Sequence, residues 1–334
     1  MTETRTGTAS VVDRTHSMAA AGTVVAAHFL GRTAVLVLGN EAMLFVEPEG
    51  EPRRIAVHAG AILATAADGA RIVSGGDDGQ VVATDAAGRS RTIATDPKHR
   101  WIDHVALAPD GAVAWSAAKT AFVQAKTVRE FEAPSTVGGL AFLPKGFRLA
   151  VAHYNGATLW FPNAPQAAPE SLEWKGSHLG ATASPDGRFL VTTMQEPMLH
   201  GWRLTDRQDM RMSGYAARVT SLSWTLGGRF LATSGSTRLV LWPFQGKDGP
   251  MGKQPRLLAA SEHRIEVVAC HPKQDIVAAG YADGMVLLVR IADDAEILAK
   301  KPGNAPITAL AWSADGDRLA FGTEEGEAGI VDLA

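Results

Sequence analysis

Residues 265–290 read IEVVACHPKQDIVAAGYADGMVLLVR, and this stretch contains the unit that decides the fold. An apolar run at 265–270 is followed by a polar turn, a second run at 275–279, an Asp-Gly turn at Asp283-Gly284 and a third run at 285–290. Valine and isoleucine favour strands, and Asp-Gly tolerates the positive φ of a tight hairpin. The stretch is therefore predicted to form three antiparallel strands in succession.

The same unit recurs along the whole chain, and the turn after its first strand is the easiest marker. The copies are Gly31-Arg32-Thr33 (degenerate), Ala67-Asp68-Gly69, Pro109-Asp110-Gly111, Pro144-Lys145-Gly146, Pro185-Asp186-Gly187, Leu226-Gly227-Gly228, Pro272-Lys273-Gln274 and Ala314-Asp315-Gly316. Successive copies are about 40 residues apart, which is the length of a four-stranded propeller blade. We therefore predict an all-β fold, a closed β-propeller of eight four-stranded blades, formed by residues 1–334 as a single domain.

The last unit lacks an outer strand, because the sequence ends at Ala334 after its third strand. The missing strand has to come from elsewhere, or the last blade keeps an open edge. The segment Ala9–Asp13 precedes the first full unit and is predicted to complete the last blade, which closes the ring. A ring of seven blades is the alternative, and it would mean that the repeat has been misread.

Composition and charge give no reason to expect a nucleic-acid-binding, secreted or membrane protein. The chain has 334 residues, a net charge of -3 and one cysteine, Cys270. This charge gives no reason to expect binding to nucleic acid or to an anionic membrane, and a lone thiol forms no internal disulfide. The N-terminal residues lack the apolar segment of a secretory signal, and no uncharged apolar run reaches the roughly 18 residues of a membrane helix. We expect a cytoplasmic, monomeric protein without a cofactor.

Several motifs resemble the WD40 repeat family. The stretch Ser74-Gly75-Gly76-Asp77-Asp78-Gly79 is similar to the family's turn between the second and third strands, and Trp160, Trp202 and Trp242 stand at the place of its third-strand tryptophan. No literal Trp-Asp or Gly-His dipeptide occurs, so the family's hydrogen-bonded tetrad of His, Ser/Thr, Asp and Trp is incomplete in most units. The resemblance implies a non-catalytic propeller that binds protein partners.

In this family the loops that enter the first strands and the turns between the second and third strands share one face, which we call the top face. Aromatic and charged side chains there are typical of a binding surface, although loops are also polar simply because they are solvated. The candidates for partner binding on this face are His58, Asp77, Asp78, His178, Glu196, Tyr215, His263, Asp283 and Glu324.

Two other functions remain open from the sequence. His178, Glu196 and His200 fall in one predicted unit, and two imidazoles with a carboxylate suit Zn²⁺ or a similar metal if they converge. Their spacing matches no standard ligand motif, so metal binding is an alternative and not the main prediction. A propeller enzyme with a site at the mouth of the central channel is the further alternative, with His28 and His104 as candidate members.

Two motifs that suggest chemistry are better explained otherwise. The loop Gln245–Lys253 has glycines and lysines but not the order of a phosphate-binding loop, so we expect a solvent-exposed or contact loop. Cys270 and His271 are neighbours, but adjacent residues of a strand point to opposite faces. A buried, inert thiol is therefore expected.

Overall fold

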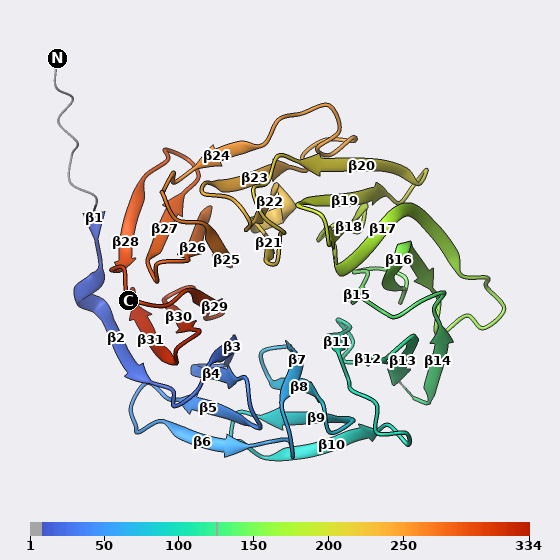
Figure 1. The fold of residues 1–334 in the computed structure, drawn as a ribbon, viewed down its shortest axis with the longest axis horizontal. Coiled ribbons are helices and arrows are strands. Elements are labelled where there is room, and N and C mark those ends of the chain that lie inside the picture. The colour runs from blue at the N-terminus through green and yellow to red at the C-terminus, as the bar shows by residue number, and fades with distance from the viewer. Residues whose placement is uncertain (1–8, 125) are drawn as a thin grey trace.

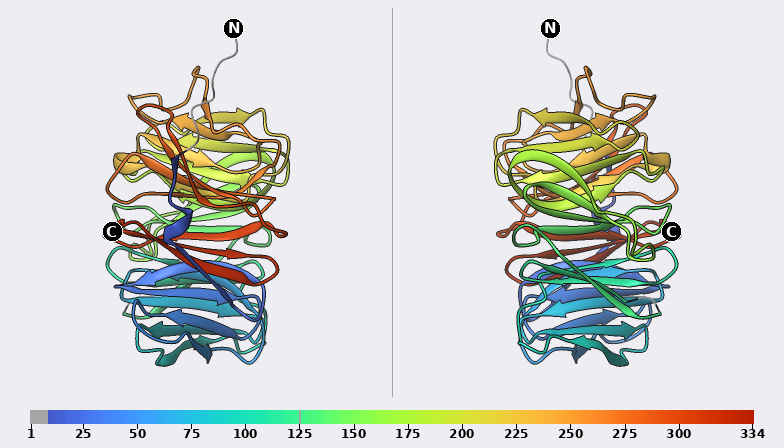
Figure 2. Two further views of the ribbon diagram at one scale, coloured as in Figure 1. Left: turned by 90° about the vertical axis from the view of Figure 1, so that its left-hand side faces the viewer. Right: turned by 90° about the vertical axis from the view of Figure 1, so that its right-hand side faces the viewer.

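The computed structural model describes residues 9–124 and 126–334, and its strands are arranged as sheets around a central axis (Figure 1). In the side views the sheets stand next to one another across the ring (Figure 2). Each sheet is a meander whose neighbouring strands are antiparallel, apart from one short parallel pair at the N-terminus. Within the described residues, neither short helical segment is long and apolar enough to span a bilayer.

Five sheets have four strands. The first three of them along the chain are β3 (Val24–Leu30), β4 (Thr33–Leu38), β5 (Ala42–Val46), β6 (Arg53–Ala56); β7 (Ile62–Ala67), β8 (Arg71–Gly76), β9 (Gln80–Asp85), β10 (Ser90–Thr95); and β11 (His104–Leu107), β12 (Val113–Ala117), β13 (Thr120–Gln124), β14 (Val128–Glu132). The fourth has β21 (Leu222–Trp224), β22 (Phe230–Thr233), β23 (Leu239–Pro243), β24 (Arg256–Leu258) and the short helix η2 (Leu226–Gly228). The fifth has β29 (Ile307–Trp312), β30 (Arg318–Thr323), β31 (Glu327–Asp332) and the N-terminal strand β2 (Thr15–Ala19).

The remaining two sheets are larger. One has six strands, β15 (Gly139–Phe142), β16 (Leu149–Trp160), β17 (Glu170–Ala183), β18 (Phe189–Met194), β19 (Met198–Arg203) and β20 (Gln208–Ser213). The other has β25 (Ile265–Cys270), β26 (Ile276–Tyr281), β27 (Val286–Arg290) and β28 (Glu296–Lys300), with β1 (Ala9–Ser10) added at its outer edge.

The prediction of eight four-stranded blades is wrong. When each hydrogen-bonded sheet is counted as one blade, the ring has seven. The difference arises in the six-stranded sheet, which contains strands assigned from the sequence to two units. β16 continues through the Asn155-Gly156 turn, and β17 pairs with β16 through Glu170–Glu173 and with β18 through His178–Ala183. The shared element β17 therefore joins the two units into one sheet.

An N-terminal strand does complete the last sheet, but the prediction named the wrong residues. β2 pairs antiparallel with β31, from Thr15 opposite Val331 to Ala19 opposite Glu327. The predicted segment Ala9–Asp13 lies one step further out: Ala9 and Ser10 pair in parallel with β28, and η1 (Val12–Arg14) follows. The N-terminal segment thus contacts two neighbouring sheets at the outside of the ring (Figure 1).

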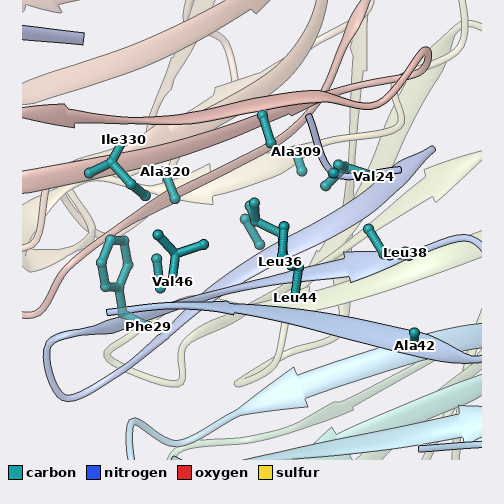
Figure 3. Packing of buried hydrophobic residues seen from close by; sticks show 14 residues of the cluster. Val24, Phe29, Leu36, Leu38, Ala42, Leu44, Val46, Ala309, Ala320 and Ile330 are labelled. Atoms are coloured by element: carbon teal, nitrogen blue, oxygen red, sulfur yellow. The ribbon is translucent and has the colours of Figure 1, made fainter. Parts of the chain in front are cut away.

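The sheets pack through apolar side chains, as Figure 3 shows at the seam between the first and last sheets. Phe29, Leu36 and Val46 of the first sheet share a buried cluster with Ala320 and Ile330 of the last. Burial of this apolar surface is the dominant favourable term in forming such a ring.

Glycines in second strands let the sheets approach closely. A Cβ added to Gly75 of β8 would lie 2.5 Å from Cγ2 of Ile102, next to the first strand of the following sheet. Gly280 of β26 has the same relation to Ile307 of β29, also at 2.5 Å. The repeated contact shows that the inner ends of neighbouring sheets are packed too tightly for a side chain at these positions.

A β-bulge recurs near the start of the first strands. The register shifts across one residue in each of five first-strand pairings, and the residues at these bulges are Val25, Leu63, Leu179, Glu266 and Thr308. A bulge leaves one residue outside the ladder and re-aims its side chain. The side chains at the bulges therefore differ in chemistry from one sheet to the next, whereas the strand pairing around each bulge is equivalent.

Candidate protein-binding face

Top-face loops are tied to the sheets by a repeated backbone hydrogen bond. The amide of the turn between the second and third strands donates to a carbonyl of the loop before the first strand, as in Asp77 to Ala61 (3.0 Å) and Ala282 to Arg264 (2.8 Å). The same bond joins Glu324 to Pro306 at 3.1 Å. The top face is therefore a fixed part of the ring and positions its side chains reproducibly.

His58 and Asp78, both predicted as partner-binding residues, are members of a structural network. Nδ1 of His58 donates to the Asp78 carboxylate at 3.0 Å, and Nε2 accepts from the Ser74 hydroxyl at 2.8 Å. The same carboxylate accepts from the amides of Ala59 and Gln80, each at 3.0 Å. The His58 side chain is wholly buried. These hydrogen bonds lower the pKa of Asp78, so its carboxylate stays charged and holds the loop.

Tyr215 has an equivalent role in the sheet β21–β24. Nε1 of Trp242 donates to the Tyr215 hydroxyl at 2.6 Å, and the two hydroxyls of Tyr215 and Thr233 lie 2.8 Å apart. Burial raises the pKa of the Tyr215 phenol to about 12. The neutral phenol thus connects a top-face loop to the end of β22 and is the hydrogen-bond partner that the buried indole of Trp242 needs.

His178 and His200 are buried next to each other but do not form a metal centre with Glu196. Nε2 of His178 donates to the Trp174 carbonyl at 3.0 Å, and Nδ1 accepts from the Thr192 hydroxyl at 2.8 Å, so neither nitrogen is free to coordinate. His200 stacks on the Trp174 indole with ring centroids 4.0 Å apart. Glu196 is exposed to solvent. Across residues 9–124 and 126–334, no three potential ligands gather as a metal site.

Five of the predicted residues remain accessible on the top face. Glu196, His263 and Glu324 are exposed, and Asp77 and Asp283 are half-buried. His263 and Asp283 face each other, with Nε2 and Oδ2 3.8 Å apart. Asp283 also accepts from the Met285 amide at 3.0 Å, which stabilises its own turn. The accessible candidates are therefore spread around the ring and are not gathered in one cluster.

One concave feature of the top face brings two residues selected from the sequence, His104 and His178, together with several that were not. A cavity of about 620 Å³ is lined by Leu63, Asp103, Val137, Tyr154 and Leu179, among others. Leu63 and Leu179 are bulge residues of two first strands, β7 and β17. Leu63, Leu179 and Tyr154 keep 39%, 36% and 52% of their surface exposed. The repeated position within each unit was a signal in the sequence, but only the structure shows that these apolar side chains face solvent together.

A second cavity of about 690 Å³ adjoins the first. Ser135 and Tyr154 line both cavities, and Trp174, Glu173 and Lys175 line the second. Trp174 is held in place by its stacking on His200. The two cavities together form a continuous groove over β16 and β17, which we call the Tyr154 groove.

The enzyme candidates do not assemble a reactive site. His28 donates to or accepts from the Thr65 hydroxyl at 2.8 Å, and burial lowers its pKa to about 4. Cys270 is surrounded by protein, and burial raises the pKa of its thiol to about 12, which disfavours the thiolate that a nucleophile requires. Nε2 of the neighbouring His271 donates to the Gly316 carbonyl at 3.1 Å, so this imidazole nitrogen is not available to the Cys270 thiol as a base. His104 lines the Tyr154 groove and its pKa is lowered by burial.

The radial meanders and their closure by β2 define the class of the protein, a β-propeller. Residues 268–334 match the family model described as the WD40 domain of anaphase-promoting complex subunit 4. This C-terminal part of the chain is therefore similar to a WD40 domain, and the ring of antiparallel sheets agrees with that similarity. None of the curated proteins is significantly similar to it.

Proposed function

We propose that the chain is a non-catalytic scaffold that binds protein partners through its top face. The observation that supports this proposal most is the gathering of exposed apolar side chains there. Among the described residues, five of the eight exposed large hydrophobic side chains belong to top-face positions, namely Val25, Leu63, Trp101, Tyr154 and Leu179. Contiguous exposed apolar surface rimmed by polar groups is typical of interaction sites.

The face is suited to binding because it is rigid and chemically mixed. Its loops are fixed by the His58 and Tyr215 networks, so a partner would lose little affinity to ordering the surface. Asp77, Glu196, His263, Asp283 and Glu324 are accessible at other points of the same face and supply polar groups there. We also propose that the chain is monomeric and acts in the cytoplasm. Sedimentation of the purified chain tests the monomeric state.

The test is site-specific photo-crosslinking in the native cell. A photoreactive residue is placed singly at Glu196, His263 or Glu324 on the top face, and at Asp110 or Asp186 on the opposite face, all of them exposed. We expect the same crosslinked protein from at least two top-face positions and from neither control position. Crosslinks of that protein from the opposite face, or none from the top face, would contradict the proposal.

A further inference from the structure

The Tyr154 groove differs from the rest of the rim in a way that the fold does not require. Bulge positions have the same backbone geometry around the ring, yet they hold exposed apolar residues at Val25, Leu63 and Leu179 and polar residues at Glu266 and Thr308. Leu63 and Leu179 line one cavity together. Because polar residues satisfy the same structural role across the ring, the exposed leucines are not needed for packing. Exposed leucine side chains lower the solubility of a protein, and where they gather on a surface they commonly mark a binding site.

A carboxylate lies between these apolar side chains. Asp103 follows Ile102, which packs on Gly75 as Ile307 packs on Gly280, so Asp103 stands at the position that Thr308 takes in the last sheet. It lines the first cavity with Leu63 and Leu179. Within the part of the chain that the structure describes, its side chain forms no ion pair, and burial raises the pKa of its carboxyl group. A half-buried carboxylate without a charged partner is a favourable place for an incoming cation.

Two further carboxylates and one cation lie near the groove. Glu173 lines the second cavity, and Glu196 lies beside Gly176, whose added Cβ would be 3.4 Å from Oε2 of Glu196. Lys175 is the opposing charge among the lining residues. The groove is thus apolar at its centre, and carboxylates outnumber cations at its edges.

We propose that the Tyr154 groove binds a short extended segment of a partner protein that presents an apolar side chain next to lysine or arginine. The apolar side chain packs between Leu63, Tyr154 and Leu179, and the cation pairs with Asp103. Trp174 extends the apolar floor for the next residue of the segment. This inference rests on the proposed function and adds to it the subsite and the chemistry of the partner.

Selection of peptides from a random 12-residue display library on the intact chain tests the inference. We expect enriched peptides to share an apolar residue flanked by lysine or arginine. Synthetic copies should bind at least tenfold more weakly to Asp103→Asn and to a Leu63→Ser/Leu179→Ser variant, and their affinity should fall with added salt.

The matched control is Glu266→Gln, which removes a carboxylate from the same bulge position on another part of the rim. It should bind the selected peptides as the unaltered chain does. Circular dichroism and urea unfolding show whether each variant is folded, and the exposed positions of Leu63 and Leu179 favour that outcome.

Enriched peptides that are acidic, or that bind equally well to the groove variants, would overturn the assignment of the groove. An absence of any enriched motif would overturn it too. None of these outcomes decides whether the top face has a partner, because photo-crosslinking at Glu196, His263 and Glu324 measures that separately.

Discussion

Hydroxyl groups of second strands decide how the top-face loops are held. Ser74, Thr192 and Thr233 each bond a ring from a top-face segment, supplied by His58, His178 and Tyr215 respectively. A single buried hydrogen bond contributes little net stability, but leaving one partner unpaired costs much more. These residues therefore contribute to the shape of the top face more than to its binding chemistry.

Tyr215→Phe tests this at one atom. The substitution removes the hydroxyl that accepts from Trp242 and leaves a buried indole N–H without a partner, so the free energy of unfolding should fall by about 1–3 kcal/mol. Urea denaturation followed by tryptophan fluorescence measures it. Tyr154→Phe is the matched control, because its hydroxyl belongs to a half-exposed side chain, and it should change the unfolding free energy little. Equal effects of the two substitutions would contradict the role given to Tyr215.

Histidine burial predicts the pH dependence of stability. The folded-state pKa values of His28 and His200 are lowered to about 4 and about 3, mainly by burial. Between about pH 4 and 6.5 the unfolded chain therefore binds more protons than the folded chain, and stability should fall as pH falls through this window. His28→Gln should flatten that slope in urea unfolding measured from pH 7 to pH 4. A slope that is unchanged in the variant would show that His28 contributes nothing to it.

At the residue scale, the sequence identified polar positions of the top face but not their burial. His58 and Asp78 were expected to meet a partner, and the structure turns them toward Ser74 and the Ala59 amide. Whether a polar side chain points outward depends on the loop beside it, and that loop is not adjacent in the sequence. For the same reason, nothing in the sequence separated the exposed leucines of the groove from the buried ones.

At the element scale, close contact between sheets depends on second-strand glycines. Gly75→Ala adds a methyl group 2.5 Å from Cγ2 of Ile102 and 2.7 Å from its carbonyl oxygen, and a backbone atom cannot move aside as a flexible side chain does. We expect a loss of about 1–3 kcal/mol in unfolding free energy. Gly22→Ala is the control, since its added Cβ meets the Asn40 side-chain nitrogen at 3.3 Å and nothing nearer. Thermal or urea unfolding of both variants checks the difference.

Strand boundaries were predicted well wherever an Asp-Gly or Pro-Asp-Gly turn marks them, and poorly where pairing decides them. β17 spans the boundary between two units of the sequence repeat, and its centre at Lys175-Gly176 interrupts the apolar pattern. Ala9–Asp13 is predicted as the closing strand because it precedes the first full unit, whereas the true strand β2 reads THSMA. An outer strand with one face in solvent needs few apolar residues, so its sequence gave little signal.

At the scale of the whole molecule, ring closure depends on the pairing of β2 with β31. The guanidinium of Arg318 adds to the seam by donating to the Arg32 carbonyl and by lying 5.4 Å over the Phe29 ring. Removal of residues 1–20 should expose the edge of β31, lower the stability and promote self-association through that edge. Analytical ultracentrifugation detects the association. Removal of residues 1–10, which takes away β1 and keeps β2, should leave the protein monomeric; if both truncations associate equally, edge exposure is not the cause.

The first-strand bulges also bear on how such a ring can be altered. Each bulge residue stands outside the ladder, so exchanging its side chain leaves the strand pairing on both sides unchanged. The rim therefore separates the part of the sequence that specifies the ring from the part that specifies a ligand. A combinatorial library confined to Val25, Leu63, Leu179 and Glu266 could be searched for new binding specificities, and most of its members should fold as this chain does. Thr308 is kept because its hydroxyl donates to the Val24 and Gly322 carbonyls.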